Sequence, residues 1–312
     1  MEEPLTIIKP NVFVGVFWLV ILDFIVSVTF GISAGVASVL IGLIVFLSVF
    51  LFLFIFIFFR IMSLRNTQYL FFKDRLEYYE GFLNQEKRTL QYSKVTDCIF
   101  KRSVYDRVFN VGTILLLTAG QGTMISVGVR LTALDNSHQL YGQLMQLLKI
   151  YGSKGSLTGE PILETRPQIL AGLFLYVLVL ILISLFMGNF IGQGMESFVI
   201  GVIAGIVIFL LLLFFRMMSL KSTKYLFYKD RLEHYDGFLN QVRRTLPYTK
   251  VTDCILNKNV YERVFGVGTI LLLTAGQQGV GRLAIYGGVK LAFAENPDQL
   301  YGKLMEMLNL KK

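Results

Sequence analysis

The sequence has few charged residues for its length. Asp, Glu, Lys and Arg make up 16% of the 312 residues, whereas about a quarter is usual in soluble domains. Hydrophobic residues account for 54% of the chain, and the mean hydropathy is +0.60. This composition excludes an ordinary soluble domain and predicts an integral membrane protein.

Cysteine and histidine are scarce, with two of each. Cys98 and Cys254 occupy the same position in two copies of a repeat, so we expect both to be reduced, buried and cytosolic. His138 and His234 fall at unrelated repeat positions and make no metal pair. The chain also lacks a Cys/His cluster, a nucleophile elbow, a P-loop and an H-E-x-x-H motif. We therefore expect no cofactor, no metal and no enzymatic activity.

The hydrophobic residues are concentrated in two long runs. Residues 11–59 contain one charged side chain, Asp23, and residues 167–215 contain one, Glu196. Each run has room for two spans of about 20 residues joined by a turn. The expected spans are Val12–Phe30, Val36–Phe59, Ile169–Met187 and Ser197–Phe215, with turns at Gly31, Ser33 and Gly35 and at residues 188–194.

Basic residues border only one end of these spans. Neither turn contains Lys or Arg, whereas the opposite ends are flanked by Lys9, Arg60, Arg65, Arg166, Arg216, Lys221 and Lys224. The N-terminal segment has no cleavage site and predicts an uncleaved first span. The positive-inside rule then predicts a plasma-membrane protein with four spans and with both termini and both repeated domains in the cytoplasm.

The segment Tyr69–Gly120 is repeated at Tyr225–Gly276. With the alignment extended to Arg60 and Arg216, about 44 of 61 positions are identical. A period of about 156 residues is too long for a solenoid repeat, so each copy is expected to be a domain. The boundaries predicted are hairpin 1–59, domain 60–150, linker 151–166, hairpin 167–215 and domain 216–310.

Each domain reads as a series of strands closed by helices. We expect strands at 67–73, 76–82, 88–92, 95–100 and 111–118, with the last one central. A short helix at 104–109 follows a cap at Ser103 or Asn259, and it ends at Asn110 or Gly266. After Gly120 a difference in length between the copies indicates a hairpin loop. A closing amphipathic helix follows, preceded in the second copy by Asn296-Pro297 and marked by Leu140, Leu144, Leu147 and Leu148 and by Leu300, Leu304, Met307 and Leu308.

The order of these motifs resembles one known family. The chain reads Y-L-x(3)-D-R-L-E-x-Y-x-G-F-L, then R-T-L-x-Y-x-K-V-T-D, then V-Y-x-R-V-F-x-V-G-T, then a closing L-Y-x-x-L helix. Behind a two-span hairpin, this pattern resembles the bacterial PH-domain membrane proteins, the YdbS/YdbT-like group, over nearly the whole chain and twice.

This resemblance implies a fold and little chemistry. It implies a membrane protein of helices and strands, with two transmembrane α-hairpins, each followed by a pleckstrin-homology-like (PH-like) β-barrel or sandwich capped by a C-terminal helix. The turn Lys73-Asp74-Arg75 is too short to form the basic pocket of phosphoinositide-binding PH domains. The resemblance therefore does not imply recognition of a particular headgroup by that route.

The net charge is +9, with +5 over residues 60–166, +7 over 216–312 and −3 over the rest of the chain. Beside membrane spans, such an excess indicates the anionic cytoplasmic leaflet rather than nucleic acid. The candidates for lipid contact are Arg60, Arg65, Arg216, Lys221 and Lys224. Topological anchoring explains these five residues equally well.

A second set of basic residues can form a partner-binding face on the domains. It comprises Lys87, Arg88, Lys101, Arg102, Arg243, Arg244 and Lys258. A solvated charged surface is the simpler account of them. Arg107 and Arg263 are expected to pair with an acid of their own domain, such as Asp97 or Asp253, as structural ion pairs.

Asp23 is the one acid expected inside the first span. An intramembrane carboxylate is a candidate functional group. The third span has no equivalent acid, so a proton or ion path through the spans would be asymmetric.

Three functions remain on these grounds. The first is a non-enzymatic scaffold that holds two PH-like domains at the inner leaflet, where they bind membrane lipid, a protein partner or another copy of the chain. The alternative is a small transporter or channel subunit with regulatory PH-like domains, for which the spans offer few polar residues. A nucleic-acid module is remote because acids are interleaved with the bases.

Overall fold

The computed structural model describes residues 3–36, 38–82, 85–118, 128–152, 160–191, 195–274 and 288–308. Two compact units can be separated. Unit 1 comprises Met1–Val95, Arg102–Leu115 and Val129–Gly152, and unit 2 comprises Thr96–Lys101, Leu116–Gly128 and Ser153–Lys312. The expected hairpin loop after Gly120 and its counterpart lie outside the described residues.

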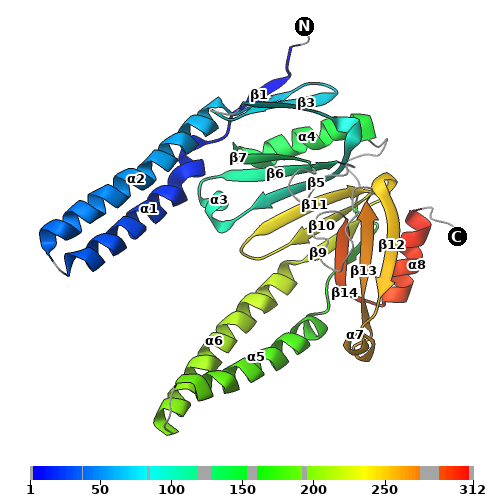
Figure 1. The fold of residues 1–312 in the computed structure, drawn as a ribbon. Coiled ribbons are helices and arrows are strands. Elements are labelled where there is room, and N and C mark those ends of the chain that lie inside the picture. Colours follow the sequence, from blue (N-terminus) through cyan, green and yellow to red (C-terminus); the bar gives the residue numbers. More distant parts are fainter. Residues whose placement is uncertain are drawn as a thin grey trace. The chain divides into compact units, whose positions relative to one another are not determined.

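The elements follow the same order in both copies of the repeat (Figure 1). The first copy contains β1 (Thr6–Ile8), α1 (Val12–Gly35), α2 (Val39–Asn66), β2 (Gln68–Phe71), β3 (Arg75–Glu80), β4 (Glu86–Gln91), η1 (Tyr92–Lys94), β5 (Val95–Arg102), α3 (Val104–Val108), β6 (Val111–Thr118), β7 (Gly128–Asp135) and α4 (Ser137–Gly152). The second contains β8 (Leu163–Thr165), α5 (Ile169–Ile191), α6 (Met195–Ser222), β9 (Lys224–Phe227), β10 (Arg231–Asp236), β11 (Gln241–Pro247), η2 (Tyr248–Lys250), β12 (Val251–Asn257), α7 (Val260–Val264), β13 (Val267–Thr274), β14 (Val289–Glu295) and α8 (Pro297–Met307).

Three helices in the described part of the chain are long and apolar enough to cross a membrane. They are Val12–Gly35, Val39–Asn66 and Gly201–Ser222, and no more than 22% of any of them is buried inside the protein. Apolar side chains left bare over that length need hydrocarbon around them. Helix α5 is apolar as well over Ile169–Leu182.

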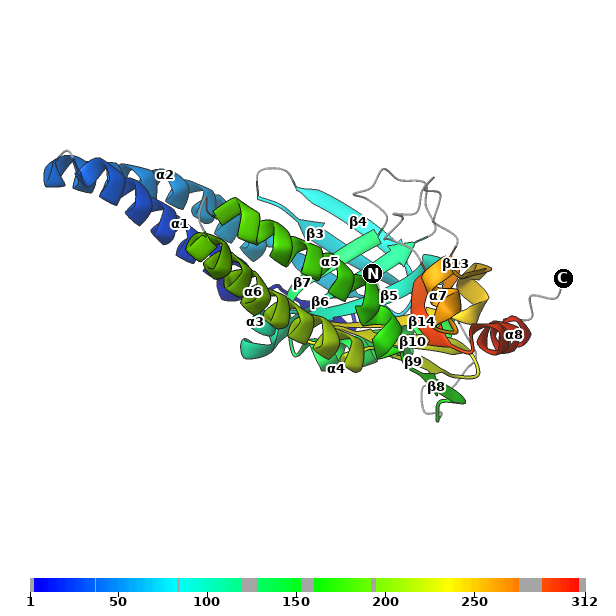
Figure 2. The ribbon, with the colours of Figure 1, turned by 90° about the horizontal axis from the view of Figure 1, so that it is seen from below.

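Helices α1 and α2 pack side by side through glycines (Figure 2). A Cβ atom on Gly42 would lie 2.7 Å from the Cα of Gly35 and 2.8 Å from the carbonyl oxygen of Gly31. The expectation of a turn at Gly31, Ser33 and Gly35 is wrong, because all three residues lie in α1. Small residues here allow two helix backbones to approach closely, which is common between membrane helices.

The second helix of each hairpin runs past the apolar segment. Helix α2 ends at Asn66 and α6 ends at Ser222, so each continues beyond the expected domain boundaries at 60 and 216. Leu64 explains the extension in the first copy. It is 4% exposed and packs with Val16 and Ile57, so the last turns of α2 stay against α1.

The strand that precedes each hairpin pairs with the strand that follows it. Thr6 of β1 is opposite Phe71 of β2, and Leu163 of β8 is opposite Phe227 of β9, both in antiparallel register. Strands β1 and β8, which have three residues each, were not expected from the sequence. Strand β8 also lies in the segment expected to be a linker.

All the strand pairs with a determined register are antiparallel. One sheet has the order β1-β2-β3-β4, and another has the order β12-β13-β14. The third has the order β7-β6-β5-β11-β10-β9-β8. The stretch Thr96–Lys101 of β5 belongs to unit 2, and β5 neighbours β11 in this order.

Leucine and other apolar side chains fill the cores between sheets and closing helices. In unit 2, Phe227, Leu232, Leu246, Ile270 and Leu291 are fully buried, and Leu300 and Leu304 of α8 join their cluster. In the first copy Leu140 and Leu144 of α4 are also buried. The stripe read from the sequence at these positions is therefore confirmed as the buried face of both closing helices.

The short helices begin and end as their sequences predict. Ser103 and Asp106 form a capping box on α3, and Asn259 and Glu262 form one on α7. Asn110 has φ 53° and Gly266 has φ 65°, so both are in the left-handed conformation expected at a helix end. Helices and antiparallel sheets thus make up the fold.

We predict that Gly42→Leu destabilises the first hairpin by about 1–3 kcal/mol, because the new side chain would collide with the backbone of α1. The readout is thermal unfolding of the full chain in detergent, followed by circular dichroism and by the fluorescence of Trp18. The control is Gly142→Leu, since an added Cβ there meets nothing within 4 Å. Equal melting temperatures for the two variants would show that the glycine contact is unimportant.

We also predict that acid destabilises unit 2 through His234. This ring stacks on Tyr225 at 4.7 Å between centroids, and burial lowers the pKa of His234 to about 4, with Asp236 opposing. Above pH about 6.5 the His234 side chain is neutral in both the folded and the unfolded chain. Below this pH His234 is protonated in the unfolded chain but stays neutral in the folded chain. The free energy of unfolding therefore falls by about 2 kcal/mol between pH 6.5 and 4.

The control for His234 is supplied by the other copy, which has Tyr78 at the same position. His234→Tyr should flatten this part of the stability profile measured by thermal unfolding from pH 7.5 to 4.5. Identical profiles for the wild type and this variant would contradict the assignment.

Candidate membrane-proximal surface

The short helix α3 is held against the start of α1 by aromatic rings. Tyr105 and Phe109 are four residues apart, so they share one face of α3. The ring centroid of Phe17 lies 5.5 Å from that of Tyr105 and 5.3 Å from that of Phe109. The hydroxyl of Tyr105 donates a hydrogen bond to the carbonyl oxygen of Val14 at 2.9 Å. Helix α3 therefore lies level with the first two turns of an apolar span.

The aromatic cluster also includes the only tryptophan of the chain. Trp18 lies 5.5 Å from Tyr105 between ring centroids and is 58% exposed. Tryptophan and tyrosine concentrate where hydrocarbon meets headgroups, because one end of each ring is apolar and the other is polar. The cluster marks the level at which this part of unit 1 would meet a bilayer surface.

Two exposed valines stand on α3 beside this cluster. Val104 is 45% exposed and Val108 is 74% exposed, and their spacing of four residues puts them on one face. Each immediately precedes a ring that packs on α1, so the valine face adjoins the docked face. We name Val104 and Val108 the valine ridge of unit 1.

Unit 2 has the same arrangement. Val260 and Val264 of α7 are 81% and 78% exposed and form the valine ridge of unit 2. The next residue, Phe265, packs on Phe174 of α5 with 5.2 Å between centroids. A pair of bare valines therefore occurs in each unit next to the first helix of its hairpin. Neither ridge was expected from the sequence, although it shows apolar residues four positions apart on each short helix.

The five residues expected at the lipid surface do not all lie on one kind of element. Arg60 and Arg65 are exposed on the last two turns of α2, and Lys221 is exposed at the end of α6. Arg216 is half-buried on α6. Lys224 is on β9, and its ammonium lies 5.0 Å from the ring centroid of Tyr235.

Most of the second basic set is engaged within the protein. Lys87 pairs with Glu77 at 3.3 Å, and Arg243 pairs with Glu233 at 3.1 Å. The remaining contacts join Arg88 to Glu86, Lys258 to Asp298, Arg244 to Asp97, and Arg102 to Asn110 and to the carbonyl of Val111. Lys101 is exposed on β5. These contacts favour structural roles for the set over a common face for a partner.

The expected pairing of Asp97 with Arg107 is wrong. The carboxylate of Asp97 is paired with Arg244, and the Asp97 residue is only 1% exposed. Burial raises the pKa of Asp97, and the Arg244 guanidinium opposes that effect. Asp253, the counterpart of Asp97, accepts a hydrogen bond from the backbone N–H of Cys254 at 2.8 Å instead. The partner of Asp97 therefore comes from β11, a strand far away in the sequence.

Asp23 is enclosed by the first hairpin. It is 3% exposed, and the hydroxyl of Ser27 one turn later donates a hydrogen bond to it at 3.1 Å. Ser27 is fully buried. This acid thus has a neutral partner on its own helix.

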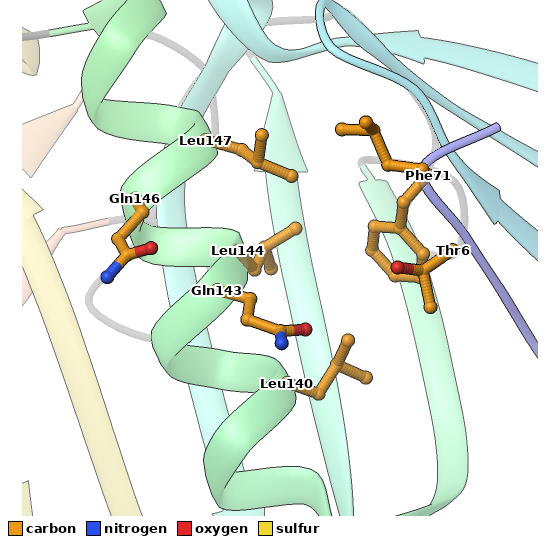
Figure 3. Close-up of a pocket in the computed structure, with 8 residues that line it drawn as sticks. Thr6, Phe71, Leu140, Gln143, Leu144, Gln146 and Leu147 are labelled. Atoms are coloured by element: carbon orange, nitrogen blue, oxygen red, sulfur yellow. The ribbon is translucent and has the colours of Figure 1, made fainter. Parts of the chain in front are cut away.

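A cavity of about 270 Å³ lies between β1 and the closing helix α4 in unit 1 (Figure 3). It is lined by Leu5, Thr6, Phe71, Leu140, Gln143, Leu144, Gln146 and Leu147. These residues are apolar or carry neutral amide and hydroxyl groups. None of them is titratable, so the cavity provides no acid, base or nucleophile for chemistry.

The thiols and acids of the described residues do not form a reactive centre. Cys98 and Cys254 are both free and buried, as expected. Burial raises the pKa of both thiols, that of Cys254 to about 11, so they stay protonated at neutral pH. Within the described ranges, no group of three or more His, Cys, Asp or Glu side chains is placed to hold a metal ion.

Comparison with known protein families matches the bacterial PH domain over residues 12–148 and again over 169–307. Each match begins at the first residue of a helical hairpin and ends in a closing helix, so the hairpin and the sheets behind it form one repeated unit. A search of curated proteins finds no match. The chain therefore belongs to the bacterial PH domain family, of which it carries two tandem copies.

Proposed function

We propose that the protein is a non-enzymatic, integral membrane scaffold that presents two PH-like domains at the inner face of the plasma membrane. There the domains bind a protein partner or the anionic membrane surface. The observation that carries this proposal is the pair of valine ridges, each beside the first helix of an apolar hairpin. A solvated domain gains nothing from bare valines at that place, whereas a domain resting on lipid does.

The proposed topology has four spans, with α5 as the fourth beside the three long apolar helices. Lys and Arg lie at the ends of α2 and α6 nearest the sheets, which favours a cytoplasmic location for both domains. An even number of spans in each copy returns the chain to the same side. Both termini then lie in the cytoplasm.

The basic residues near the helix ends would add an electrostatic contribution to the lipid contact. Arg60, Arg65 and Lys221 are exposed there. Each can contribute about 1 kcal/mol near an anionic leaflet, and salt would screen that contribution. The valines and the basic residues would together hold each domain flat on the surface.

The transporter alternative has less support. Its one candidate group, Asp23, is bonded to Ser27 and enclosed within a single hairpin. A carboxylate that is enclosed and accepts a hydrogen bond one turn along its own helix fits a structural polar contact within α1 as well as an ion path.

We predict that the valine ridges enter the lipid headgroup region. Val108→Cys and Val264→Cys, labelled with an environment-sensitive fluorophore in the reconstituted full chain, should show blue-shifted emission and quenching by lipid-attached nitroxides. Vesicles of phosphatidylcholine with and without phosphatidylglycerol separate the apolar contribution from the anionic one. Gly142→Cys on α4 is the control, since that position is exposed and an added Cβ there meets nothing within 4 Å. Water-like emission from both valine positions would rule out lipid contact by the ridges.

We predict that both domains are cytoplasmic. Gly142 and Gly302 occupy equivalent places on α4 and α8, and an added side chain meets nothing within 4 Å at either. Gly142→Cys and Gly302→Cys should therefore react with a membrane-impermeant maleimide only after the inner membrane is permeabilised. Labelling of either variant in intact spheroplasts would contradict the proposed topology.

A further inference from the structure

Two strands that begin with the same five residues lie in different surroundings in this chain. Strands β5 and β12 both begin V-T-D-C-I. In β5, Asp97 is 1% exposed and Ile99 is 6% exposed. In β12, their counterparts Asp253 and Ile255 are exposed, Ile255 by 40%. The difference cannot come from the local sequence, so it comes from what lies beside each strand.

Strand β5 is covered by its neighbour β11. The two strands are adjacent in the sheet order, and the stretch Thr96–Lys101 belongs to the same unit as β11. The joint is marked by the ion pair between Asp97 and Arg244, whose side chains are 0% and 12% exposed. Strand β12, by contrast, ends its sheet in the order β12-β13-β14.

The strand equivalent to β11 also ends a sheet. This is β4, last in the order β1-β2-β3-β4. Arg88 of β4 corresponds to Arg244 of β11. The side chain of Arg88 is 43% exposed, whereas that of Arg244 is 12% exposed. Thr89 of β4 is exposed, whereas the equivalent Thr245 is 5% exposed. Within the part of the chain that the structure describes, one pair of these edges is therefore joined internally, and the sister pair, β12 and β4, ends its sheets.

We propose that β12 of one chain pairs with β4 of a second copy of this chain, with Asp253 accepting Arg88 across the joint. The internal joint between β5 and β11 shows that strands with these sequences pair edge to edge, with an acid facing an arginine. A second copy of the chain supplies the same two sequences in β12 and β4. Open strand edges are templates for pairing with another chain. The inference deepens the proposed scaffold function by naming the partner, and it needs no lipid contact.

The two chains contribute different strands to this joint, so it is either made twice in a two-fold dimer or made once in a head-to-tail contact. Head-to-tail contacts close into rings or continue as open chains, depending on the rotation between copies. The exposed Ile255 would be covered by the pairing, as Ile99 is covered inside the chain.

One sequence difference between the copies sets the strength of the interchain joint. Arg88 is held by Glu86 on its own strand, whereas the position equivalent to Glu86 is Val242 in β11. Arg244 thus has no acid two residues before it and pairs with Asp97 directly. Arg88 must leave Glu86 to reach Asp253, so the interchain joint is weaker and more easily reversed than the internal one.

The test uses full-length chains with two different affinity tags, expressed together. One carries Arg88→Cys and the other Asp253→Cys, and a short bis-maleimide is added to the membranes. We expect the mixed pair to give crosslinked dimers at least several-fold more than either variant with itself. Lys87→Cys paired with Asp253→Cys is the matched control, since Lys87 is the neighbouring residue and turns to Glu77. The native thiols are buried and should contribute little background.

A second variant tests the joint by strengthening it. Glu86→Val copies β11 into β4 and should raise the crosslinked fraction and the oligomer fraction in detergent, whereas Asp253→Arg should lower both. Adding Arg88→Asp to Asp253→Arg should restore them.

The proposal is overturned if the mixed pair crosslinks no more than the Lys87 control, or if Glu86→Val leaves the oligomer fraction unchanged. Efficient crosslinking of Arg88→Cys with itself would also overturn it, because that result requires a symmetric contact between β4 strands. A different protein or lipid covering these edges would give the first of these results. Lipid contact by the valine ridges is measured separately, so the two proposals can fail independently.

Discussion

The architecture depends on each apolar hairpin being tied to a sheet by the two strands at its base. Strand β1 enters α1 and strand β2 leaves α2, and these two strands are hydrogen-bonded to each other. Strands β8 and β9 do the same around α5 and α6. The hairpin and the sheet therefore share one base and cannot swing freely. The docking of α3 on α1 through Tyr105 adds a third attachment.

The same attachment places the candidate surface. Because α3 is clamped to the start of α1, whatever it exposes is held at the level where the apolar span begins. The exposed residues are valines in both copies, and the acids beside them, Asp106 and Glu262, take part in capping boxes. The family match over hairpin and sheets together is consistent with a unit in which the membrane and domain parts work as one piece.

Duplication has left the two copies alike in fold and different at their strand edges. The residues Glu86 and Val242 stand at equivalent positions, as do Tyr78 and His234, and each exchange changes the electrostatics of a strand pair. An acid beside Arg88 competes for it, whereas valine leaves Arg244 to Asp97. A single substitution can thus separate an internal joint from an external one.

The sequence by itself determined the apolar hairpins, the duplication, the closing helices and the caps at Ser103 and Asn110, because these depend on periodicity or on residues a few positions apart. It misplaced the first turn, because Gly31 and Gly35 look like turn residues until a facing helix explains them. Only the tertiary structure decided that β1 pairs with β2, that Asp97 meets Arg244 and that Asp253 stays open. Identical local sequences make identical strands, but the covering of a strand edge depends on which distant segment reaches it, and local sequence does not specify that.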